Sequence, residues 1–260
     1  MAAAFALLGL GYVIYGAREW APPLASQHGI GIDRMLAFLL SATGLMFLAG
    51  HLALGWLIWT ASRRGRVSVR MSTARTERIL SVALGVLMTV VAEFGVLVLA
   101  LPVWDVYFGT EAPDDAVALE ITGQQFVWTA RYPGPDGMFG RTDPHLIEDP
   151  NNSIGLDRSE PTAADDILST NQITVPVGRP VSVTLRSRDM IHSFWLPHFR
   201  VKQDVVPGMS IPIWFVPTRE GTFEILCTEV CGLGHYRMQA FFNVVSPAEF
   251  DRWLAERATQ

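Results

Sequence analysis

The sequence predicts a membrane-anchored all-β protein, in which an N-terminal pair of transmembrane helices precedes a small β domain outside the membrane. Three observations predict it: two long apolar segments, a basic loop between them, and short strand-like runs in the second half of the chain. Of the 260 residues, half are hydrophobic and 17% are charged, which suits one folded domain joined to membrane segments. The net charge of -5 argues against a nucleic-acid partner, because phosphate recognition requires a basic surface.

The first 33 residues form a leader whose nature the sequence leaves open. Residues 2–15 are apolar but short, and Arg18 and Glu19 end the stretch. A cleaved signal peptide, a third short membrane or interfacial helix, and a leader without fixed structure all fit this pattern. A signal peptide normally begins with a basic region, which is missing here.

Two apolar stretches, Met35 to Thr60 and Ile79 to Trp104, predict a transmembrane hairpin over residues 34–104. Each exceeds the roughly 20 helical residues that cross a hydrocarbon core. The region that joins them carries one acid, Glu77, and six arginines: Arg63, Arg64, Arg66, Arg70, Arg75 and Arg78. The positive-inside bias therefore puts this loop in the cytoplasm and residues 105–260 outside. Glu93 lies within the second stretch, and we expect it to face a neighbouring subunit.

The exterior region predicts a small antiparallel β-sandwich or barrel followed by a helix. Val181 to Arg186 alternates apolar and polar residues, as a strand with one buried face does. Three further β-branched or aromatic runs predict strands: Ile211 to Phe215, Thr222 to Leu226 and Ala240 to Val245. Ser246 with Glu249 three positions later forms a capping box, which predicts a closing helix.

Acidic residues gather between the second membrane segment and these strands. From 105 to 170 there are thirteen acids and three arginines. Residues 133–166 are rich in Pro, Gly, Asp and Asn, which predicts a long ordered loop or insertion. The acids are those of a solvated loop, and they could also steer a positively charged protein partner.

A candidate metal site lies near the C-terminus, where Cys227 to Met238 reads C-T-E-V-C-G-L-G-H-Y-R-M. Two thiols, an imidazole and a thioether within one short segment favour copper or zinc, and the methionine favours copper. A disulfide between Cys227 and Cys231 is the alternative in an oxidising exterior. His192, in an upstream H-S-F-W segment, offers a second imidazole.

At these residues the sequence resembles cytochrome c oxidase subunit II. That family has the motif C-x-E-x-C-x-x-x-H-x-x-M and an upstream His-Ser-aromatic segment, which together build the binuclear copper centre called CuA. The resemblance also covers the two membrane helices, Lys202, Asp204 and the pair Pro207-Gly208. It implies a cupredoxin-like Greek-key β-sandwich or barrel.

The resemblance implies one set of copper ligands, drawn from two segments of the chain: His192, Cys227, Glu229, Cys231, His235 and Met238. The two thiolates would bridge both coppers. His192 and Met238 would complete one copper, while His235 and the backbone carbonyl of Glu229 would complete the other. The Glu229 side chain resembles the family position that reaches a magnesium ion at the junction with subunit I.

The implied function is electron transfer in a terminal heme-copper oxidase. Electrons would pass from a cytochrome c-type donor, soluble or held in a supercomplex, to the heme of subunit I, where oxygen is reduced to water. No Cys-x-x-Cys-His motif occurs, so a donor heme must belong to another chain. Glu77 resembles a family acid at a proton-channel entrance, although an acid in the first turn of a helix explains it equally well.

The chain departs from the family pattern at two positions. The segment G-Q-Q-F-V-W resembles an aromatic run whose first tryptophan accepts electrons, but this chain has Phe126 there and keeps Trp128. Both are candidates for the point where electrons arrive, and the smaller ring at 126 favours a tethered donor. Met209 stands where many members carry arginine.

Three other functions compete with this interpretation. A CuA subunit of a nitric oxide reductase would share the same motif. A membrane-tethered carrier with a single copper would not need the second cysteine and second histidine. A structural subunit with a disulfide and no metal would not need the complete ligand set.

Overall fold

The computed structural model describes residues 21–63 and 73–258. It forms two compact units, of which one is Ile30–Gly109 and the other takes its described residues from both sides of that range. The interpretations of residues 2–15 and most of the basic loop lie outside the described residues.

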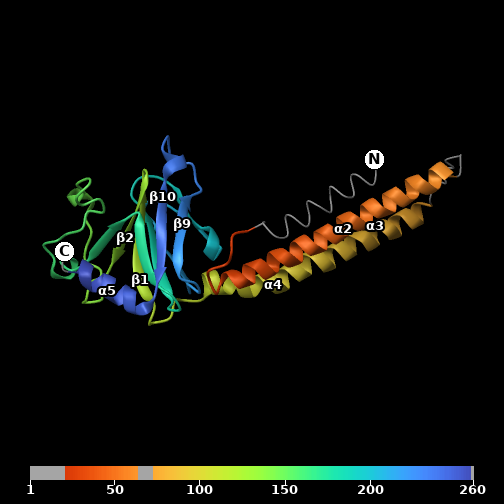
Figure 1. The fold of residues 1–260 in the computed structure, drawn as a ribbon. Helices are drawn as coiled ribbons and strands as arrows, with labels where there is room; N and C mark the ends of the chain where they lie inside the picture. The colour runs from red at the N-terminus through yellow and green to blue at the C-terminus, as the bar shows by residue number, and fades with distance from the viewer. Residues whose placement is uncertain (1–20, 64–72, 259–260) are drawn as a thin grey trace. The chain divides into compact units, whose positions relative to one another are not determined.

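The helical unit contains two candidate membrane spans, Gly29–Arg63 and Ala74–Gly109, of 35 and 36 residues. Two apolar helices are therefore present where they were predicted, and each is longer than its apolar stretch. The second span changes helix type along its length. Its elements, together with the first helix, are α2 (Gly29–Arg63), α3 (Ala74–Met88), the π-helix η1 (Thr89–Phe94), α4 (Gly95–Trp104) and the π-helix η2 (Asp105–Gly109). Figure 1 shows the two spans as α2 and as the pair α3 and α4.

Both ends of the helix pair connect to the β unit. Before α2, Ala25 is fully buried, and Ser26 forms a β-bridge with Pro217. After the second span, Thr110 belongs to the same β unit. The segments on both sides of the helix pair therefore belong to one folded unit, and the two candidate spans can anchor that unit in a membrane.

The β unit consists of two five-stranded sheets that make a sandwich (Figure 1). The first sheet has the order β3-β2-β1-β5-β8 and the second β4-β10-β9-β6-β7. The strands are β1 (Val117–Gln124), β2 (Val127–Tyr132), β3 (Ile167–Thr170), β4 (Gln172–Pro176), β5 (Val181–Ser187), β6 (His192–Leu196), β7 (Val201–Val205), β8 (Ile211–Phe215), β9 (Gly221–Cys227) and β10 (Gln239–Val245). The predicted fold class, two apolar helices followed by a β-sandwich, is confirmed.

The expectation of purely antiparallel sheets is wrong in one respect. In the first sheet β1 pairs with β5 in parallel, and in the second β10 pairs with β4 in parallel. The chain leaves the first sheet after β3, forms β4 in the second, and returns with β5, so β1 and β5 meet without a direct hairpin. Local alternation of apolar residues could not reveal this, because it fixes which face is buried and not which strand is the neighbour.

The insertion between β2 and β3 is ordered, as predicted, and contains the 3-10 turns η3 (Pro144–Leu146) and η4 (Pro161–Ala163). Arg131 anchors it from β2: its guanidinium bonds to Asp166 at 2.8 Å and to Glu120 at 3.0 Å. Asp149 pairs with Arg188, and Asp157 pairs with Arg141. Several of the acids therefore have arginine partners, which reduces the negative surface expected from the sequence.

The chain ends in α5 (Pro247–Arg257), which confirms the predicted closing helix. The Ser246 hydroxyl accepts a hydrogen bond from the Glu249 backbone N–H at 3.3 Å, as expected of a capping residue. Phe250 is buried, so one face of the helix packs on the sandwich.

Candidate metal centre

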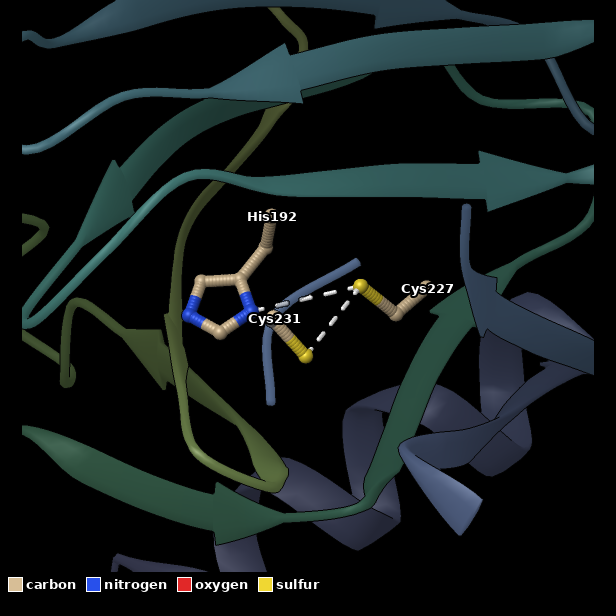
Figure 2. Close-up of side chains that lie close together, drawn as sticks. All are labelled: His192, Cys227 and Cys231. Carbon is tan, nitrogen blue, oxygen red and sulfur yellow. Dashed lines mark hydrogen bonds between the residues drawn. The ribbon is translucent and has the colours of Figure 1, made fainter. Parts of the chain in front are cut away.

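Strands β6 and β9 bring the two ligand-bearing segments together. His192 is the first residue of β6, and Cys227 is the last residue of β9. These strands are antiparallel neighbours, with Phe194 opposite Cys227. The start of one strand therefore lies beside the end of the other, and Figure 2 shows His192 with both cysteines converging on one point. Residues 35 positions apart in sequence reach the same place because of this pairing.

The chain after Cys227 folds back as a loop, residues 228–238, that supplies the remaining candidate ligands. Its base closes with a hydrogen bond from the Cys227 N–H to the Met238 carbonyl at 3.2 Å. The Thr228 N–H donates to the Ser193 carbonyl at 3.1 Å, which ties the loop to β6. The 3-10 turn η6 (His235–Arg237) then directs His235 and Met238 back toward the cysteines.

Five donor side chains are linked by contacts through the two cysteine sulfurs. The two cysteine sulfurs are 3.9 Å apart. His192 Nδ1 lies 3.9 Å from the Cys227 sulfur, and His235 Nδ1 lies 3.6 Å from the Cys231 sulfur. The Met238 sulfur is also 3.6 Å from Cys231. We call these five side chains the ligand cluster.

The spacing and the chemistry of the ligand cluster fit a thiolate-bound metal. Four donors around an ion with metal–sulfur bonds of about 2.3 Å are separated by roughly 3.8 Å in tetrahedral geometry. The cysteines are free thiols, not a disulfide. His192, both cysteines and Met238 are all buried, which provides the dry surroundings of an electron-transfer site.

The two thiols ionise with different ease. Burial opposes ionisation of Cys227, but hydrogen bonds with His192 and with the backbone at Ser193 and Glu229 outweigh it and lower its pKa to about 6. Burial and the neighbouring Cys227 raise the pKa of Cys231 to about 11. Ionisation of one thiol therefore opposes ionisation of the other, and a bound cation would offset this repulsion.

Asp189 holds the ring of His192 in one orientation. Its Oδ1 lies 2.7 Å from His192 Nε2 and accepts the Met190 N–H at 2.7 Å, while Oδ2 accepts the Gln125 N–H at 2.8 Å. A carboxylate only accepts hydrogen bonds, so Nε2 carries a proton, and Nδ1 is the nitrogen that faces the sulfurs and would bind a metal there. Sequence analysis did not identify Asp189; an acid three residues before a candidate ligand was the only available signal.

Phe126 lies against the ligand loop. It is half-buried in the turn between β1 and β2, and its ring packs directly on Gly234 and Gly232. A side chain at Gly234 would overlap the ring, so this close approach requires glycine. Gln125, beside it, donates a hydrogen bond from Nε2 to the Cys231 carbonyl. Sequence analysis did not single out Gln125, because an amide in a turn carries no distinctive pattern.

Trp128 occupies a different environment from Phe126. Its side chain is fully buried, and its ring centroid lies 6.0 Å from that of His192 and 5.6 Å from that of Phe194. The two candidates for electron arrival therefore differ: Phe126 is partly open to solvent, whereas Trp128 is an internal neighbour of a ligand. A partner protein could touch only the first.

The backbone carbonyl and the side chain of Glu229 lie in different surroundings. The Cys227 thiol approaches the Glu229 carbonyl oxygen at 3.2 Å, so this oxygen joins the edge of the ligand cluster. The side chain of Glu229 is exposed. Met209 is exposed as well, on the turn that follows β7.

Comparisons with known proteins show what this chain resembles. The family model described as "Cytochrome C oxidase subunit II, periplasmic domain" matches residues 117–245. The chain is 35% identical over 258 residues to the "Alternative cytochrome c oxidase subunit 2" of Bradyrhizobium diazoefficiens, covering 97% of this chain and 90% of that protein. It is 32% identical to "Cytochrome c oxidase subunit 2" of Cereibacter sphaeroides, covering 56% of this chain and 51% of the relative.

A solved structure is also similar in part. The periplasmic domain of subunit II of cytochrome oxidase of Bradyrhizobium japonicum shares 28% identity with this chain. The match covers 57% of this chain and 98% of that domain, with a TM-score of 0.43.

Proposed function

Because the chain belongs to the cytochrome c oxidase subunit II family, we propose that it is the electron-transfer subunit of a terminal heme-copper oxidase in a bacterial inner membrane. It would receive electrons from a cytochrome c-type donor and pass them to the heme of subunit I, where oxygen is reduced to water. One observation carries the proposal: five soft or imidazole donors, most of them buried, lie 3.6–3.9 Å from a cysteine sulfur at the rim of the sandwich.

The residues that would hold a binuclear copper centre are the ligand cluster and the carbonyl of Glu229. Both thiolates stand between the two imidazoles, which is the arrangement that two bridging sulfurs require. When bound, a CuA centre supplies one-electron transfer with little change in geometry, because two metals share the charge. The exposed Glu229 side chain remains free to reach a magnesium ion at the boundary with subunit I.

The chain's own residues perform three tasks around this site. Asp189 fixes the protonated nitrogen of His192 and so presents the other nitrogen to the sulfurs. Gln125 and Phe126 brace the ligand loop from the turn between β1 and β2. The buried rings of Trp128 and Phe194 exclude water on the inner side. A rigid, dry shell keeps the reorganisation that accompanies electron transfer small.

Electrons would arrive at the outer side of the same loop. Phe126 is half-buried and contacts the loop backbone, and Val230, Leu233 and Tyr236 are strongly exposed beside it. An exposed apolar group of this kind suits contact with a partner protein. The acids of the insertion that lack an arginine would guide a basic cytochrome toward it.

Copper stoichiometry and electron paramagnetic resonance of the purified full-length chain test the proposal. We expect two coppers per chain and hyperfine coupling to both nuclei. A four-line spectrum with one copper would instead support a membrane-tethered single-copper carrier, and zinc would exclude both. Oxygen and nitric oxide consumption by the purified complex separates the oxidase from a nitric oxide reductase.

A further inference from the structure

Glu93 places a carboxylate deep in the second membrane span, and the proposed function gives this carboxylate no role. It lies 16 residues after Glu77 and 11 residues before Trp104. At 1.5 Å per residue, about 16 Å of helix separate it from the tryptophan at the outer end. A headgroup or bulk water is therefore too far away to solvate it. Ionisable groups at such depth are rare and serve as functional sites by default.

The helix contacts show which way Glu93 points. The ring of Phe38 in α2 packs directly on Gly95, so Gly95 faces the other helix of the pair. Glu93 comes two positions earlier, which is about half a turn around the helix axis. Its side chain is exposed accordingly. Glu93 therefore projects away from α2, into the space that lipid or another membrane protein fills.

Nothing in the part of the chain that the structure describes satisfies this carboxylate. Glu93 makes no hydrogen bond or ion pair among those residues. His51 in α2 is the instructive contrast, because its Nδ1 lies 2.8 Å from the Phe47 carbonyl oxygen of its own helix. The histidine has a partner within its own helix, whereas the glutamate requires one from outside.

The backbone is also irregular at this point. Glu93 belongs to the π-helix η1 (Thr89–Phe94), which interrupts the span between α3 and α4. Short π-helical turns inside α-helices occur mostly at functional sites. Neither proline nor glycine lies within η1, so no helix-breaking residue accounts for it.

We propose that Glu93 is an intramembrane docking point, which binds a cationic or hydrogen-bond-donating side chain on a transmembrane helix of the partner oxidase subunit. The inference rests on the proposed function, since it requires a membrane partner. A polar side chain on a partner helix answers the three observations together: the depth, the outward direction and the missing partner. Lipid tails offer no donor and would leave the carboxylate unsatisfied.

Labelling with dicyclohexylcarbodiimide tests whether a partner covers Glu93. This hydrophobic reagent modifies protonated carboxyl groups that it reaches from the apolar phase, and peptide mass spectrometry identifies the modified residue. We expect labelling of Glu93 in the isolated chain in detergent and protection in the intact oxidase complex. Equal labelling in both would show that the side chain faces lipid and would overturn the proposal. No labelling in either would overturn it too, because the chain itself would then shield the group.

Retention of the partner tests whether the contact contributes to binding. An affinity tag on this chain recovers the complex from detergent, and mass spectrometry measures the partner per chain as the detergent becomes harsher. Glu93→Leu should lower retention by about three- to twentyfold, the range of an interhelical hydrogen bond in a membrane. Glu93→Gln, which still accepts a hydrogen bond, should fall between Glu93→Leu and the wild type. Leu97→Ala, one turn further along the same outward face, is the matched control: it removes apolar contact without removing a polar partner and should lower retention less than Glu93→Leu.

The result also separates this inference from the proposed function. Wild-type retention by Glu93→Leu, with copper content and the resonance spectrum unchanged, would overturn the docking point and leave the electron-transfer role intact. A wild-type chain that carries no copper and recovers no membrane partner would overturn both.

Discussion

Two buried polar clusters occupy the β unit, and their atoms are satisfied in different ways. In the ionic cluster, Arg131 bonds to Glu120 and Asp166, and the Asp166 carboxylate also accepts the Gly140 N–H at 3.0 Å. Opposite charges meet in this cluster, where Arg186 also bonds to Glu120 at 3.0 Å, while the other Asp166 oxygen, Oδ1, is buried without a hydrogen-bond partner among the described residues. The ligand cluster contains only soft or neutral donors, which face one another across 3.6–3.9 Å with weak sulfur contacts.

The difference separates a structural from a functional use of buried polarity. In a buried ion pair each charge is compensated by the other, and removing one member leaves an uncompensated buried charge. Donor atoms that converge with no cation among them can still bind a metal ion. We therefore expect variants in the two clusters to damage different properties.

The largest effect should follow from removing a bridging thiol. Cys227→Ser or Cys231→Ser should abolish the binuclear centre, because one remaining thiolate cannot bridge two metals. Copper content and the resonance spectrum measure the loss. Far-ultraviolet circular dichroism should stay unchanged, since a serine retains the shape of the side chain. Unfolding of these variants would contradict the separation between the clusters.

The converse effect should follow from opening the ionic cluster. Asp166→Asn should lower the free energy of unfolding by about 3–5 kcal/mol, because Arg131 would remain buried with half of its compensation lost. Urea denaturation measures this change, and the copper spectrum should persist in the folded protein. The exposed pair Arg179 and Asp251 is the control, and Asp251→Asn should have little effect. Loss of copper in Asp166→Asn would show that the two clusters are coupled.

A smaller effect should arise at the turn that braces the ligand loop. Gly234→Ala should destabilise the protein by about 1–3 kcal/mol, because the added methyl group overlaps the Phe126 ring. Phe126→Ala in the same chain should recover most of that loss. Thermal unfolding of both single variants and the double variant measures the coupling. Additive losses would place the ring away from Gly234.

Met238→Leu should affect the potential more than the metal content. A thioether is a weak ligand that tunes a copper site, and leucine preserves its volume. Redox titration of the copper spectrum should therefore show a shifted potential at nearly full copper loading. Copper loss as complete as in the cysteine variants would mean that Met238 holds the metal instead of tuning it.

The smallest effect concerns the insertion and its pH dependence. A hydrogen bond with Arg188 holds the pKa of Asp149 below its usual value of 3.8. The pair therefore stabilises the folded insertion above that value, and the stabilisation is lost as the pH falls through the lowered pKa. Hydrogen exchange of residues 141–157 should quicken over that range, and Arg188→Gln should remove the pH dependence. An identical profile in the variant would exclude this pair as the cause.

The sequence by itself determined the features that depend on neighbours along the chain. Uncharged apolar length predicts a membrane helix, and apolar alternation predicts a strand, because both properties are local. The candidate ligands between Cys227 and Met238 are also local, since twelve residues of connected chain cannot separate far. His192 was predicted as a ligand only from the family motif, because it lies far from the other ligands along the chain and no local pattern places it beside them.

The tertiary structure decided the features that depend on residues far apart in sequence. Pairing of β6 with β9 places His192 beside Cys227, and only then does Asp189 acquire a role in orienting the ring. The parallel pairs in both sheets arise from crossings between the sheets, which no local pattern records. The sequence placed Glu93 in the membrane, but its outward direction followed only from the contact between Phe38 and Gly95. Side-chain direction depends on packing between elements, and packing is a property of the folded chain.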